Sequence, residues 1–373
     1  MRSAIVIGGG VAGCAAAYAL AQRGFAVTLL ERSPRLANGA SGNRIGILHA
    51  RFSAGDIPLH QFVRAAYEHA LSLLDKVLPV DGVSRAQCGL LQLACNAVEQ
   101  KRIARLAERA WPEEFMRFVD AKQASQLAGV EMTFGGLWFP RGGWLVPGKY
   151  CETLTSHTNI TQGLDHQVNA LERSARGWQV SGVSPQNKHW QMEAETVVVC
   201  SAYEAKQFAQ FADFSLMAVR GQITELPENA ESQALKAVVC GNGYCTPANK
   251  GVHVIGATHA FEDETTELRV AEQEENLANL VGYAPALRQA WSELSLQRLN
   301  GRAAVRCSAP GSMPLVGEVQ PGLYCSLAHG TRGLLTAGLS GELVAAQICG
   351  ETSPVPEVTL SELDPLPRIR KKG

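Results

Sequence analysis

The first 31 residues contain the pattern that most constrains how this chain can fold. An apolar run at residues 3–7 predicts a buried parallel strand, and residues 12–22 continue as an alanine-rich helix. Between them lies G-x-G-x-x-G, formed by Gly8, Gly10 and Gly13. Such glycines permit a tight turn, close approach of the backbone to a pyrophosphate, and close helix–strand packing, while the helix N-terminus favours phosphate. A second apolar run at residues 27–30 ends at Glu31, whose carboxylate would bind a ribose hydroxyl. The sequence therefore predicts a dinucleotide-binding βαβ unit.

The composition limits the partners that the chain can have. With 373 residues, 46% hydrophobic and 18% charged, the chain is long enough for two domains and has a net charge of −1. This charge argues against a surface wholly adapted to nucleic acid but allows local basic patches. Basic residues gather at helical spacing and at the C-terminus: Lys101, Arg102, Arg105 and Arg109, then Arg368, Arg370, Lys371 and Lys372. We expect a solvated helix face and a soluble tail there, with contact to nucleic acid as the alternative.

The cysteines indicate a reducing compartment. Ten cysteines are dispersed without a C-x-x-C pair, so we predict no bound metal and no thioredoxin-like site. Several lie in apolar runs, as Cys200 does in TVVVCSA, where a thiol packs as a small hydrophobic group. A cytoplasmic location fits best. Glycines interrupt the N-terminal apolar segment, and Gln22 and Arg23 follow it, which argues against a signal peptide or a membrane anchor.

The remaining pattern alternates between helical and strand-like stretches. We expect helices at residues 57–78, 99–110, 149–157, 262–283 and 334–349, and strands at residues 171–183, 190–200, 219–226, 237–239, 252–257 and 322–327. Glycines, prolines and aromatic residues at 135–147 predict short strands or a loop. The run TVVVCSA predicts a strand that returns to the nucleotide-binding sheet, and residues 329–333 predict a turn before the last helix. Both ends of the chain would thus reach one cofactor, with insertions between them.

Several blocks together resemble the D-amino-acid-oxidase-like family of FAD-dependent oxidoreductases. In chain order they are IVIGGGVAG with Glu31, GASGNRIG, WLVP, VRGQ, VIGAT, SMPLVG and LAHGTRGLLTAGLSGELVA. The resemblance implies an α/β fold (α+β overall), with a Rossmann-like FAD-binding domain and an inserted β-rich substrate domain, as in D-amino-acid oxidase and glycine oxidase. We expect the FAD-binding domain at residues 1–80, 145–215 and 309–373. The substrate domain would then comprise residues 81–144 and 216–308.

The same resemblance implies non-covalent FAD and the segments that hold it. Cys307 lies directly beside Arg306, as in the tRNA-modifying members of the family, so we expect no covalent link to FAD. The implied cofactor-binding residues are Gly8, Gly10, Val11, Ala12, Gly13, Glu31 and Arg32, then Ala40, Ser41, Gly42, Asn43, Arg44 and Gly46, then Val168 near the adenine, and Gly330, Thr331, Gly333 and Leu334 in the C-terminal turn. A plain surface turn is the alternative for the segment at residues 40–46.

Four residues are implied at the substrate. Arg306 and Arg332 match family segments that border the flavin and bind a substrate carboxylate, and Tyr244 matches a tyrosine that helps hold it. His49 could face the flavin, although a packed or surface histidine is the more expected role. The alternatives are a structural ion pair for Arg306, a cofactor-supporting contact for Arg332 and simple strand packing for Tyr244. By composition alone, a wide cavity mouth could use Trp138, Phe139, Arg141 and Trp144, for which we favour a packed aromatic cluster.

Within the family, the chain resembles most the bacterial members that modify tRNA. The blocks GASGNRIG and VRC-x6-PLVG and the basic C-terminus carry this resemblance. It implies oxidative removal of the N-carboxymethyl group from 5-carboxymethylaminomethyl-(2-thio)uridine at the wobble position, which gives 5-aminomethyl-(2-thio)uridine and glyoxylate. The tRNA anticodon loop would be the substrate partner, and a separate methyltransferase would act next, because the glycine motif at residue 8 leaves no space for one before it. The alternatives are an oxidase or dehydrogenase of free glycine, sarcosine or D-amino acids, and a non-catalytic flavin-binding partner.

Overall fold

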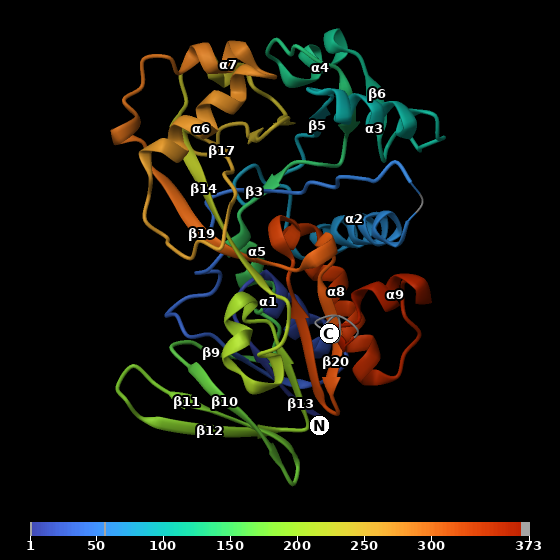
Figure 1. Ribbon diagram of the computed structural model, residues 1–373, viewed down its shortest axis with the longest axis vertical. Coiled ribbons are helices and arrows are strands. Elements are labelled where there is room, and N and C mark those ends of the chain that lie inside the picture. Colours follow the sequence, from blue (N-terminus) through green and yellow to red (C-terminus); the bar gives the residue numbers. More distant parts are fainter. Residues whose placement is uncertain (1, 56, 367–373) are drawn as a thin grey trace.

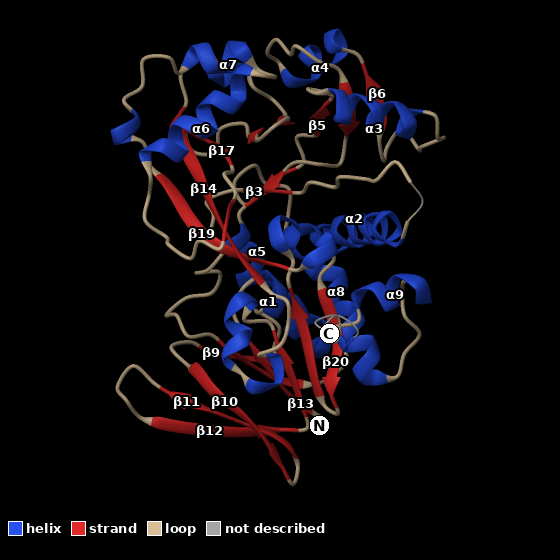
Figure 2. Ribbon diagram, in the orientation of Figure 1, coloured by secondary structure: helices blue, strands red, loops and turns tan. Residues whose placement is uncertain are grey.

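A computed structural model describes residues 2–55 and 57–366 of the chain (Figure 1). The basic C-terminal residues Arg368, Arg370, Lys371 and Lys372 lie outside the described residues. The molecule is elongated, with a parallel sheet at the end that holds the N-terminus and a mixed sheet at the other end (Figures 1 and 2). This arrangement confirms the predicted α/β class. None of the helices in the described ranges is long and apolar enough to cross a membrane.

The parallel sheet confirms the predicted βαβ unit. In the described part of the chain its strand order is β20-β21-β13-β1-β2-β9, and only β20 runs antiparallel to its neighbour. The strands are β1 (Ser3–Ile7), β2 (Ala26–Leu30), β9 (Ile160–Gly163), β13 (Thr196–Val199), β20 (Leu315–Gln320) and β21 (Leu323–Leu327). As predicted, the TVVV run returns to this sheet, where Val198 pairs with Val6 of β1. Such continuous apolar strands are typical of sheets covered on both faces.

Alternate residues of β1 pack against different layers. Ala4 and Val6 belong to the core that contains helices α1 (Val11–Gln22) and α8 (Gly333–Cys349). Ile5 and Ile7 belong to a second core with the antiparallel sheet of β10 (Gln167–Ser174), β11 (Gly177–Val183) and β12 (His189–Ala194). A side chain at Gly341 of α8 would come within 2.8 Å of the backbone of Ala15, so this glycine lets α8 approach α1 closely.

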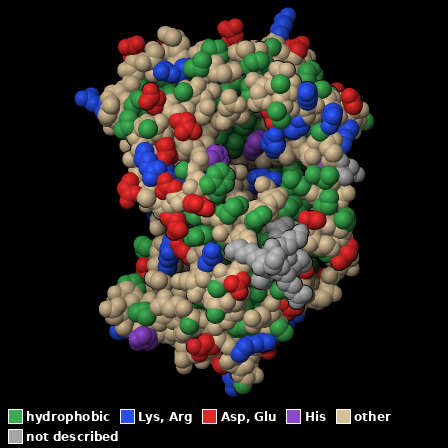
Figure 3. Space-filling model, viewed as in Figure 1, with side chains coloured by type: hydrophobic (Ala, Val, Ile, Leu, Met, Phe, Trp, Pro, Cys, Tyr) green, Lys and Arg blue, Asp and Glu red, His purple; other side chains and the backbone are tan. Residues whose placement is uncertain are grey.

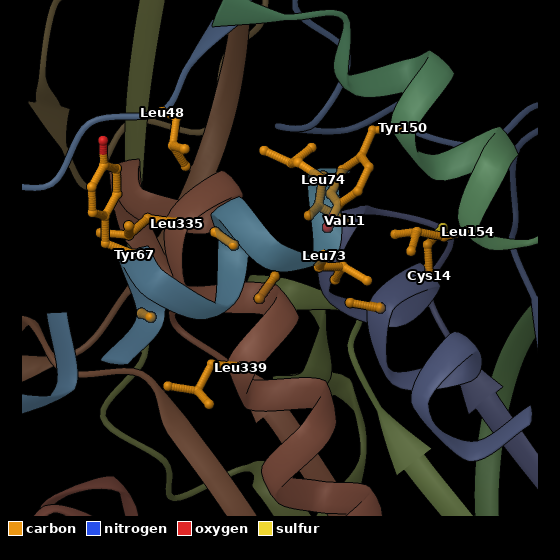
Figure 4. Packing of buried hydrophobic residues seen from close by; sticks show 14 of the residues in the cluster. Val11, Cys14, Leu48, Tyr67, Leu73, Leu74, Tyr150, Leu154, Leu335 and Leu339 are labelled. Carbon is orange, nitrogen blue, oxygen red and sulfur yellow. The ribbon is translucent and has the colours of Figure 1, made fainter. Parts of the chain in front are cut away.

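Two further helices complete the core around α1 and α8. They are α2 (Pro58–Val77) and α5 (Pro147–Leu154), and their positions agree with the predicted helices. Figure 4 shows Tyr67, Leu73 and Leu74 of α2 together with Leu335 and Leu339 of α8, which belong to the same hydrophobic cluster. The short helix α9 (Glu357–Leu363) packs beside α2 and β20. The core therefore joins the first and last parts of the chain.

The mixed sheet forms the other end of the molecule. Its strands in the described residues are β5 (Leu90–Leu93), β6 (Arg117–Val119), β7 (Gly136–Phe139), β14 (Met217–Pro227), β15 (Val238–Cys240), β16 (Tyr244–Cys245), β17 (Val252–Gly256), β18 (Ala260–Phe261) and β19 (Gly301–Ser308). Helices α3 (Ala97–Ala107), α4 (Ala121–Ala128), α6 (Val270–Val281) and α7 (Pro285–Ala290) accompany it. A small sheet of β3 (Gly46–Ile47), β4 (Arg85–Ala86) and β8 (Trp144–Leu145) completes the strands. The six 3-10 helices of the described residues are η1 (Ala202–Gln207), η2 (Ala209–Phe211), η3 (Ser232–Ala234), η4 (Leu296–Arg298), η5 (Pro310–Ser312) and η6 (Gly330–Arg332).

The extents of three predicted elements were wrong. The stretch at 171–183 is a hairpin of β10 and β11 rather than one strand, because the chain turns before Gly177, whose φ is +130°. The stretch at 190–200 is likewise divided between β12 and β13. The helix expected from residue 262 begins at Val270, since the Asp263 carboxylate accepts hydrogen bonds from the Thr265 backbone and hydroxyl. Local bonds of this kind compete with helix formation.

Candidate functional site

A cavity of about 970 Å³ lies at the carboxyl ends of the parallel strands, where their loops meet the mixed sheet. Open α/β sheets bind nucleotides at this place. All four residues predicted at the substrate line it: His49, Tyr244, Arg306 and Arg332. The predicted cofactor residues that line it are Gly8, Gly10, Val11, Ala12, Glu31, Arg32, Ala40, Ser41, Asn43, Gly46, Val168, Gly330, Thr331, Gly333 and Leu334. Figure 3 shows the hollow in the middle of one face, with histidine side chains at it.

The glycine motif forms a cradle at the end of β1. Gly8 has φ +109°, and a side chain there would come within 2.7 Å of the Cys200 carbonyl oxygen. Gly13 does not line the cavity, because its role is packing: a Cβ would lie 1.8 Å from the Gly8 carbonyl oxygen. Helix α1 begins at Val11, which lines the cavity beside Gly10. The N–H groups of this helix end are therefore placed at the cavity, as the binding of a pyrophosphate requires.

Glu31 ends β2 and already holds the loop on each side of it. Its carboxylate accepts hydrogen bonds from the backbone N–H of Gly9 at 2.7 Å and of Ser33 at 2.9 Å. The next residue, Arg32, is about half exposed and forms an ion pair with Glu204 at 2.6 Å. This acid at the cavity edge is in position for the ribose contact expected of a βαβ nucleotide site.

The segment at residues 38–46 is held in place by Arg302, a residue that the sequence analysis missed. Its Nη2 donates to the carbonyl oxygens of Asn38 at 2.7 Å and Gly39 at 2.6 Å. A Cβ at Gly42 would lie 2.8 Å from the same guanidinium, so this glycine makes space for Arg302 instead of lining the cavity. The period of a strand could have indicated Arg302, because residues 302 and 306 of β19 face the same side of the sheet.

Two more contacts attach this segment to the rest of the site. The Ser41 hydroxyl accepts a hydrogen bond from the Val11 N–H at 3.1 Å, at the N-terminus of α1. Arg44 does not line the cavity; it donates to the Asn249 carbonyl oxygen at 3.3 Å and thereby links the segment to the region of the mixed sheet. The segment is thus a structured wall of the cavity and not a free surface turn.

The cavity has the polar groups that a dinucleotide needs. The Ser201 hydroxyl is buried in its lining and has no hydrogen-bond partner among the described residues. Buried polar atoms are normally paired, so this hydroxyl indicates a partner that the protein itself does not supply. Together with the glycine cradle and the helix N-terminus, it fits a bound dinucleotide.

Arg306 is a half-buried cation without a carboxylate partner among the described residues. It lies on β19 opposite Val219 of β14, and its Nη1 donates to the Thr258 carbonyl oxygen at 3.3 Å. No ion pair within residues 2–55 and 57–366 involves Arg306. A Cβ at Gly221 of β14 would lie 2.1–2.4 Å from three guanidinium atoms of Arg306. The absence of a side chain at Gly221 therefore gives the guanidinium its position.

Tyr244 lies close enough to Arg306 for their charges to interact. Burial raises the pKa of Tyr244 to about 12, and the nearby Arg306 charge opposes this shift. Burial lowers the pKa of Arg306, but a guanidinium remains charged at neutral pH. The pair therefore offers a cation and a protonated hydroxyl donor to one cavity. This combination suits a carboxylate ligand.

The C-terminal turn brings Arg332 to the same cavity. Gly330 has φ +55°, and η6 leads directly into α8 at Gly333. Arg332 donates to the Ser312 carbonyl oxygen, and burial lowers its pKa. Leu334 of α8 closes against Gly46, where a Cβ would lie 2.4 Å from its methyl group. Two predicted cofactor segments, at residues 40–46 and 330–334, therefore contact each other.

Burial favours the neutral form of three histidines in the cavity lining, His49, His259 and His329. Burial is the largest cause that lowers the pKa of His49 and of His329 to about 4, and it also lowers the pKa of His259. His329 is fixed by hydrogen bonds between its ring nitrogens and the hydroxyls of Ser326 at 3.0 Å and Thr336 at 2.8 Å. Neither His329 nor His259 was predicted as a site residue, although His329 lies in the block LAHGTRGLLTAGLSGELVA. Neutral rings of this kind add no charge beside the two arginines.

The three aromatic residues considered for a cavity mouth are packed in the interior instead. Trp138, Phe139 and Trp144 are 8%, 1% and 3% exposed and belong to the hydrophobic cores, as the favoured alternative of a packed cluster predicted. Arg141 remains exposed and forms an ion pair with Asp75 at 2.5 Å. The pattern of glycine, proline and aromatic residues could not reveal burial, because β7 and β8 both lie inside the molecule.

The structure also describes the thiols and the other candidate ligands. Each of the ten cysteines is free, and burial raises the pKa of Cys307 in the cavity lining to about 12. No group of three or more His, Cys, Asp or Glu side chains that could hold a metal ion is found among the residues described.

Comparison with known proteins shows which family the chain belongs to. Residues 3–347 match the family model of FAD dependent oxidoreductases. Over 371 residues the chain is 51% identical to the "tRNA 5-methylaminomethyl-2-thiouridine biosynthesis bifunctional protein MnmC" of Nitrosospira multiformis, covering 98% of this chain and 60% of that protein. It is 38% identical to the MnmC of Methylobacillus flagellatus, covering 97% of this chain and 58% of that protein. The chain thus spans about 60% of the length of these curated relatives.

A solved structure shows the same fold. The glycine oxidase of Geobacillus kaustophilus superposes with a TM-score of 0.79 at 18% sequence identity, covering 98% of this chain and 99% of that one. The predicted glycine-oxidase-like architecture is therefore confirmed.

Proposed function

Because this chain belongs to the family of FAD-dependent oxidoreductases, we propose that it acts on a modified wobble uridine of tRNA. The substrate is 5-carboxymethylaminomethyl-(2-thio)uridine, an N-substituted glycine. Oxidation removes a hydride from the CH₂ group beside the carboxylate and a proton from the amine, leaving a C=N bond. Water then adds to this imine, the C–N bond breaks, and the products are 5-aminomethyl-(2-thio)uridine and glyoxylate.

The half-buried guanidinium of Arg306, which has no carboxylate partner among the described residues, is the observation that carries this proposal. It lies in the same cavity as the nucleotide cradle, and an N-substituted glycine supplies the carboxylate that it lacks. The identity of 51% to a protein named for tRNA 5-methylaminomethyl-2-thiouridine biosynthesis supports the choice of this glycine over a free one. The carboxylate of a free amino acid could bind Arg306 equally well, so modified tRNA and free amino acids must both be tested as substrates.

The cofactor site follows from the walls of the cavity. Gly8, Gly10 and the N-terminus of α1 would hold the pyrophosphate of FAD, and Glu31 would hold a ribose. The FAD would supply the acceptor for the hydride, which carries both electrons removed from the amine. We propose that it is bound without a covalent link, since the Cys307 thiol is kept protonated by burial.

The side chains around the substrate position it and do not transfer its protons. Arg306 binds the carboxylate and Tyr244 donates a hydrogen bond to it. Arg332 adds positive charge at the C-terminal turn, where it stabilises negative charge on substrate or cofactor. His49 and His329 remain neutral because of burial, so neither competes for the carboxylate as a cation.

The domain limits, location and partners belong to the same proposal. The FAD-binding domain comprises residues 1–80, 145–215 and 309–373, and the substrate domain comprises residues 81–144 and 216–308. The strands of the parallel sheet all fall in the first set, and those of the mixed sheet in the second. We place the protein in the cytoplasm, with tRNA as its substrate and a methyltransferase as the enzyme that acts next.

The test is anaerobic reduction of the purified flavoprotein. Flavin absorbance is followed after mixing with tRNA that contains 5-carboxymethylaminomethyluridine, with the same tRNA lacking the modification, and with glycine, sarcosine or D-alanine. We expect rapid bleaching by the modified tRNA and none by the unmodified one. Bleaching by a free amino acid but not by modified tRNA would replace the proposal with a free-amine oxidase, and bleaching by none would leave a non-catalytic flavoprotein.

A further inference from the structure

Basic side chains gather beside the cavity on the side of α3. We name four of them the α3 rim: Arg51, Lys101, Arg105 and Arg109. Lys101 and Arg105 are exposed, and the Arg51 side chain is 53% exposed. Figure 3 shows Lys and Arg side chains over the region of α3, to the right of the hollow. Lys101 and Arg105 are four residues apart in the helix, so they lie on the same face of it.

The α3 rim is built onto the wall of the cavity. Arg51 follows His49, which lines the cavity, by two residues. The segment that carries Arg51 is fixed to α3, because Arg102 donates to the Phe52 carbonyl oxygen at 2.8 Å and Arg109 donates to that of Ala54. Arg102 is 8% exposed and therefore has a structural role, unlike its neighbours at helical spacing. The basic surface thus continues from the helix to the cavity opening.

The carboxylate of Glu99 on α3 neutralises part of the positive charge of the α3 rim. Glu99 contacts Arg51 and forms an ion pair with Arg102 at 2.6 Å. Its side chain is only 17% exposed, so it stabilises the segment more than it screens the surface. Lys101 and Arg105 take part in no ion pair among the described residues, which leaves their charges available to a ligand.

Another wall of the cavity opening has the opposite charge. The segment at residues 262–267 contains four carboxylates, those of Glu262, Asp263, Glu264 and Glu267. Glu264 and Thr266 of this segment line the cavity. Arg269 neutralises only part of the charge, through an ion pair with Asp263 at 2.7 Å. A polyanion that enters the cavity is therefore repelled by this segment and attracted by the α3 rim.

We propose that the α3 rim binds the RNA phosphates next to the wobble nucleotide. This inference rests on the proposed function, and it adds the face by which the substrate approaches. A base that reaches the cavity must be turned out of the anticodon loop, so its flanking backbone crosses the cavity edge. Guanidinium and ammonium groups fixed at that edge hold this backbone, whereas a free amino acid has no phosphate for them to bind. The location beside the cavity favours this role over the solvated helix face that the sequence suggested.

The test is a double charge reversal, Lys101→Glu with Arg105→Glu. The matched control reverses Arg176 and Lys188, two exposed residues of the β10–β12 sheet at the opposite end of the molecule (Figure 1). Both variants change the net charge equally. Flavin reduction is measured against modified tRNA over a series of salt concentrations, and against the free nucleoside 5-carboxymethylaminomethyluridine, which has no phosphate. FAD content and Tm are measured for each variant.

We expect the rim variant to raise KM for tRNA by at least about tenfold, and the slope of log KM against log salt to fall by about 1 to 2. The rate of flavin reduction by the nucleoside, the FAD content and the Tm of the rim variant should equal those of the control variant. Equal tRNA kinetics in the rim and control variants would overturn the proposed docking face while leaving the proposed function intact. If the rim variant also lost activity toward the nucleoside, the substitutions would have damaged the structure, and the proposed docking face would be overturned too. Failure of the unaltered protein to react with any tRNA would instead refute the proposed function.

Discussion

The substitution Gly221→Ala tests the anchor without altering any charged or polar side chain. The added methyl carbon would lie 2.1, 2.2 and 2.4 Å from three guanidinium atoms of Arg306. Heavy atoms that are not bonded to each other prefer about 3.5–4.0 Å. The guanidinium must therefore move by more than about 1 Å. Gly221 lies in β14 with no positive φ, so alanine itself suits the backbone there.

The magnitude follows from this displacement. A misplacement of about 1 Å in a group that orients the substrate can reduce the rate about 100-fold. That factor corresponds to about 2.7 kcal/mol of transition-state stabilisation, which lies within the range of about 2–5 kcal/mol for losing one partner of a buried charge pair. We expect kcat/KM for modified tRNA to fall about 100-fold, with Tm and FAD affinity unchanged.

The assay combines flavin reduction with carboxylate binding. The absorbance of bound FAD is titrated with acetate, a small carboxylate that needs no RNA, and the acetate Kd should rise at least about tenfold if Arg306 is the anchor. Gly148→Ala is the matched control, because nothing lies within 4 Å of the methyl group added there. Equal acetate Kd and equal reduction rates in the two variants would refute the assignment of Arg306 as the anchor. A fall in Tm of Gly221→Ala alone would mean that the glycine serves folding.

Three further predictions concern the cofactor and the buried histidines. Arg302→Ala removes the hydrogen bonds to the segment at residues 38–43, each worth about 1.5–3 kcal/mol for a charged donor. Fluorescence titration of the apoprotein should therefore show an FAD Kd at least about tenfold higher. An unchanged Kd would contradict the role of Arg302. His49 and His329 have pKa values of about 4 in the fold against 6.5 when free. The unfolded apoprotein therefore binds more protons between these values, and its free energy of unfolding should fall as the pH decreases from 6.5 to 4, by up to about 1.4 kcal/mol per pH unit for each histidine. Denaturant titrations at several pH values check this, and a double His→Gln variant with the same pH dependence would oppose it. Acid precipitation should release all FAD into solution because the buried Cys307 thiol stays protonated, so a yellow pellet would exclude non-covalent binding.

The sequence predicted those parts of the fold that local patterns encode. The glycine motif, the apolar strands and the helix at 58–77 all correspond to observed elements, because each is defined by neighbours within one segment. The helix expected from residue 262 failed since the Asp263 side chain stabilises a competing turn. Periodicity alone could not show that competition.

The candidate site was predictable where a segment carries its own signature. Arg306 and Arg332 were selected from their sequence blocks, and the structure brings both to one cavity. Arg302 was missed because its partners, the carbonyl oxygens of Asn38 and Gly39, are more than 260 residues away along the chain. The role of Gly221 in making space for Arg306 could not be predicted either, since the atoms that a side chain at Gly221 would contact belong to another strand. Contacts between distant segments require the folded chain.

The products of the reaction distinguish oxidation of the wobble nucleoside from oxidation of a free amino acid. Purified holoenzyme is mixed anaerobically with tRNA that contains 5-carboxymethylaminomethyl-2-thiouridine, and the digested nucleosides and released acids are analysed by mass spectrometry. We expect conversion to 5-aminomethyl-2-thiouridine, with one glyoxylate formed for each FAD reduced. Reduction of the flavin by glycine or sarcosine, with the wobble nucleoside left unchanged, would contradict this expectation.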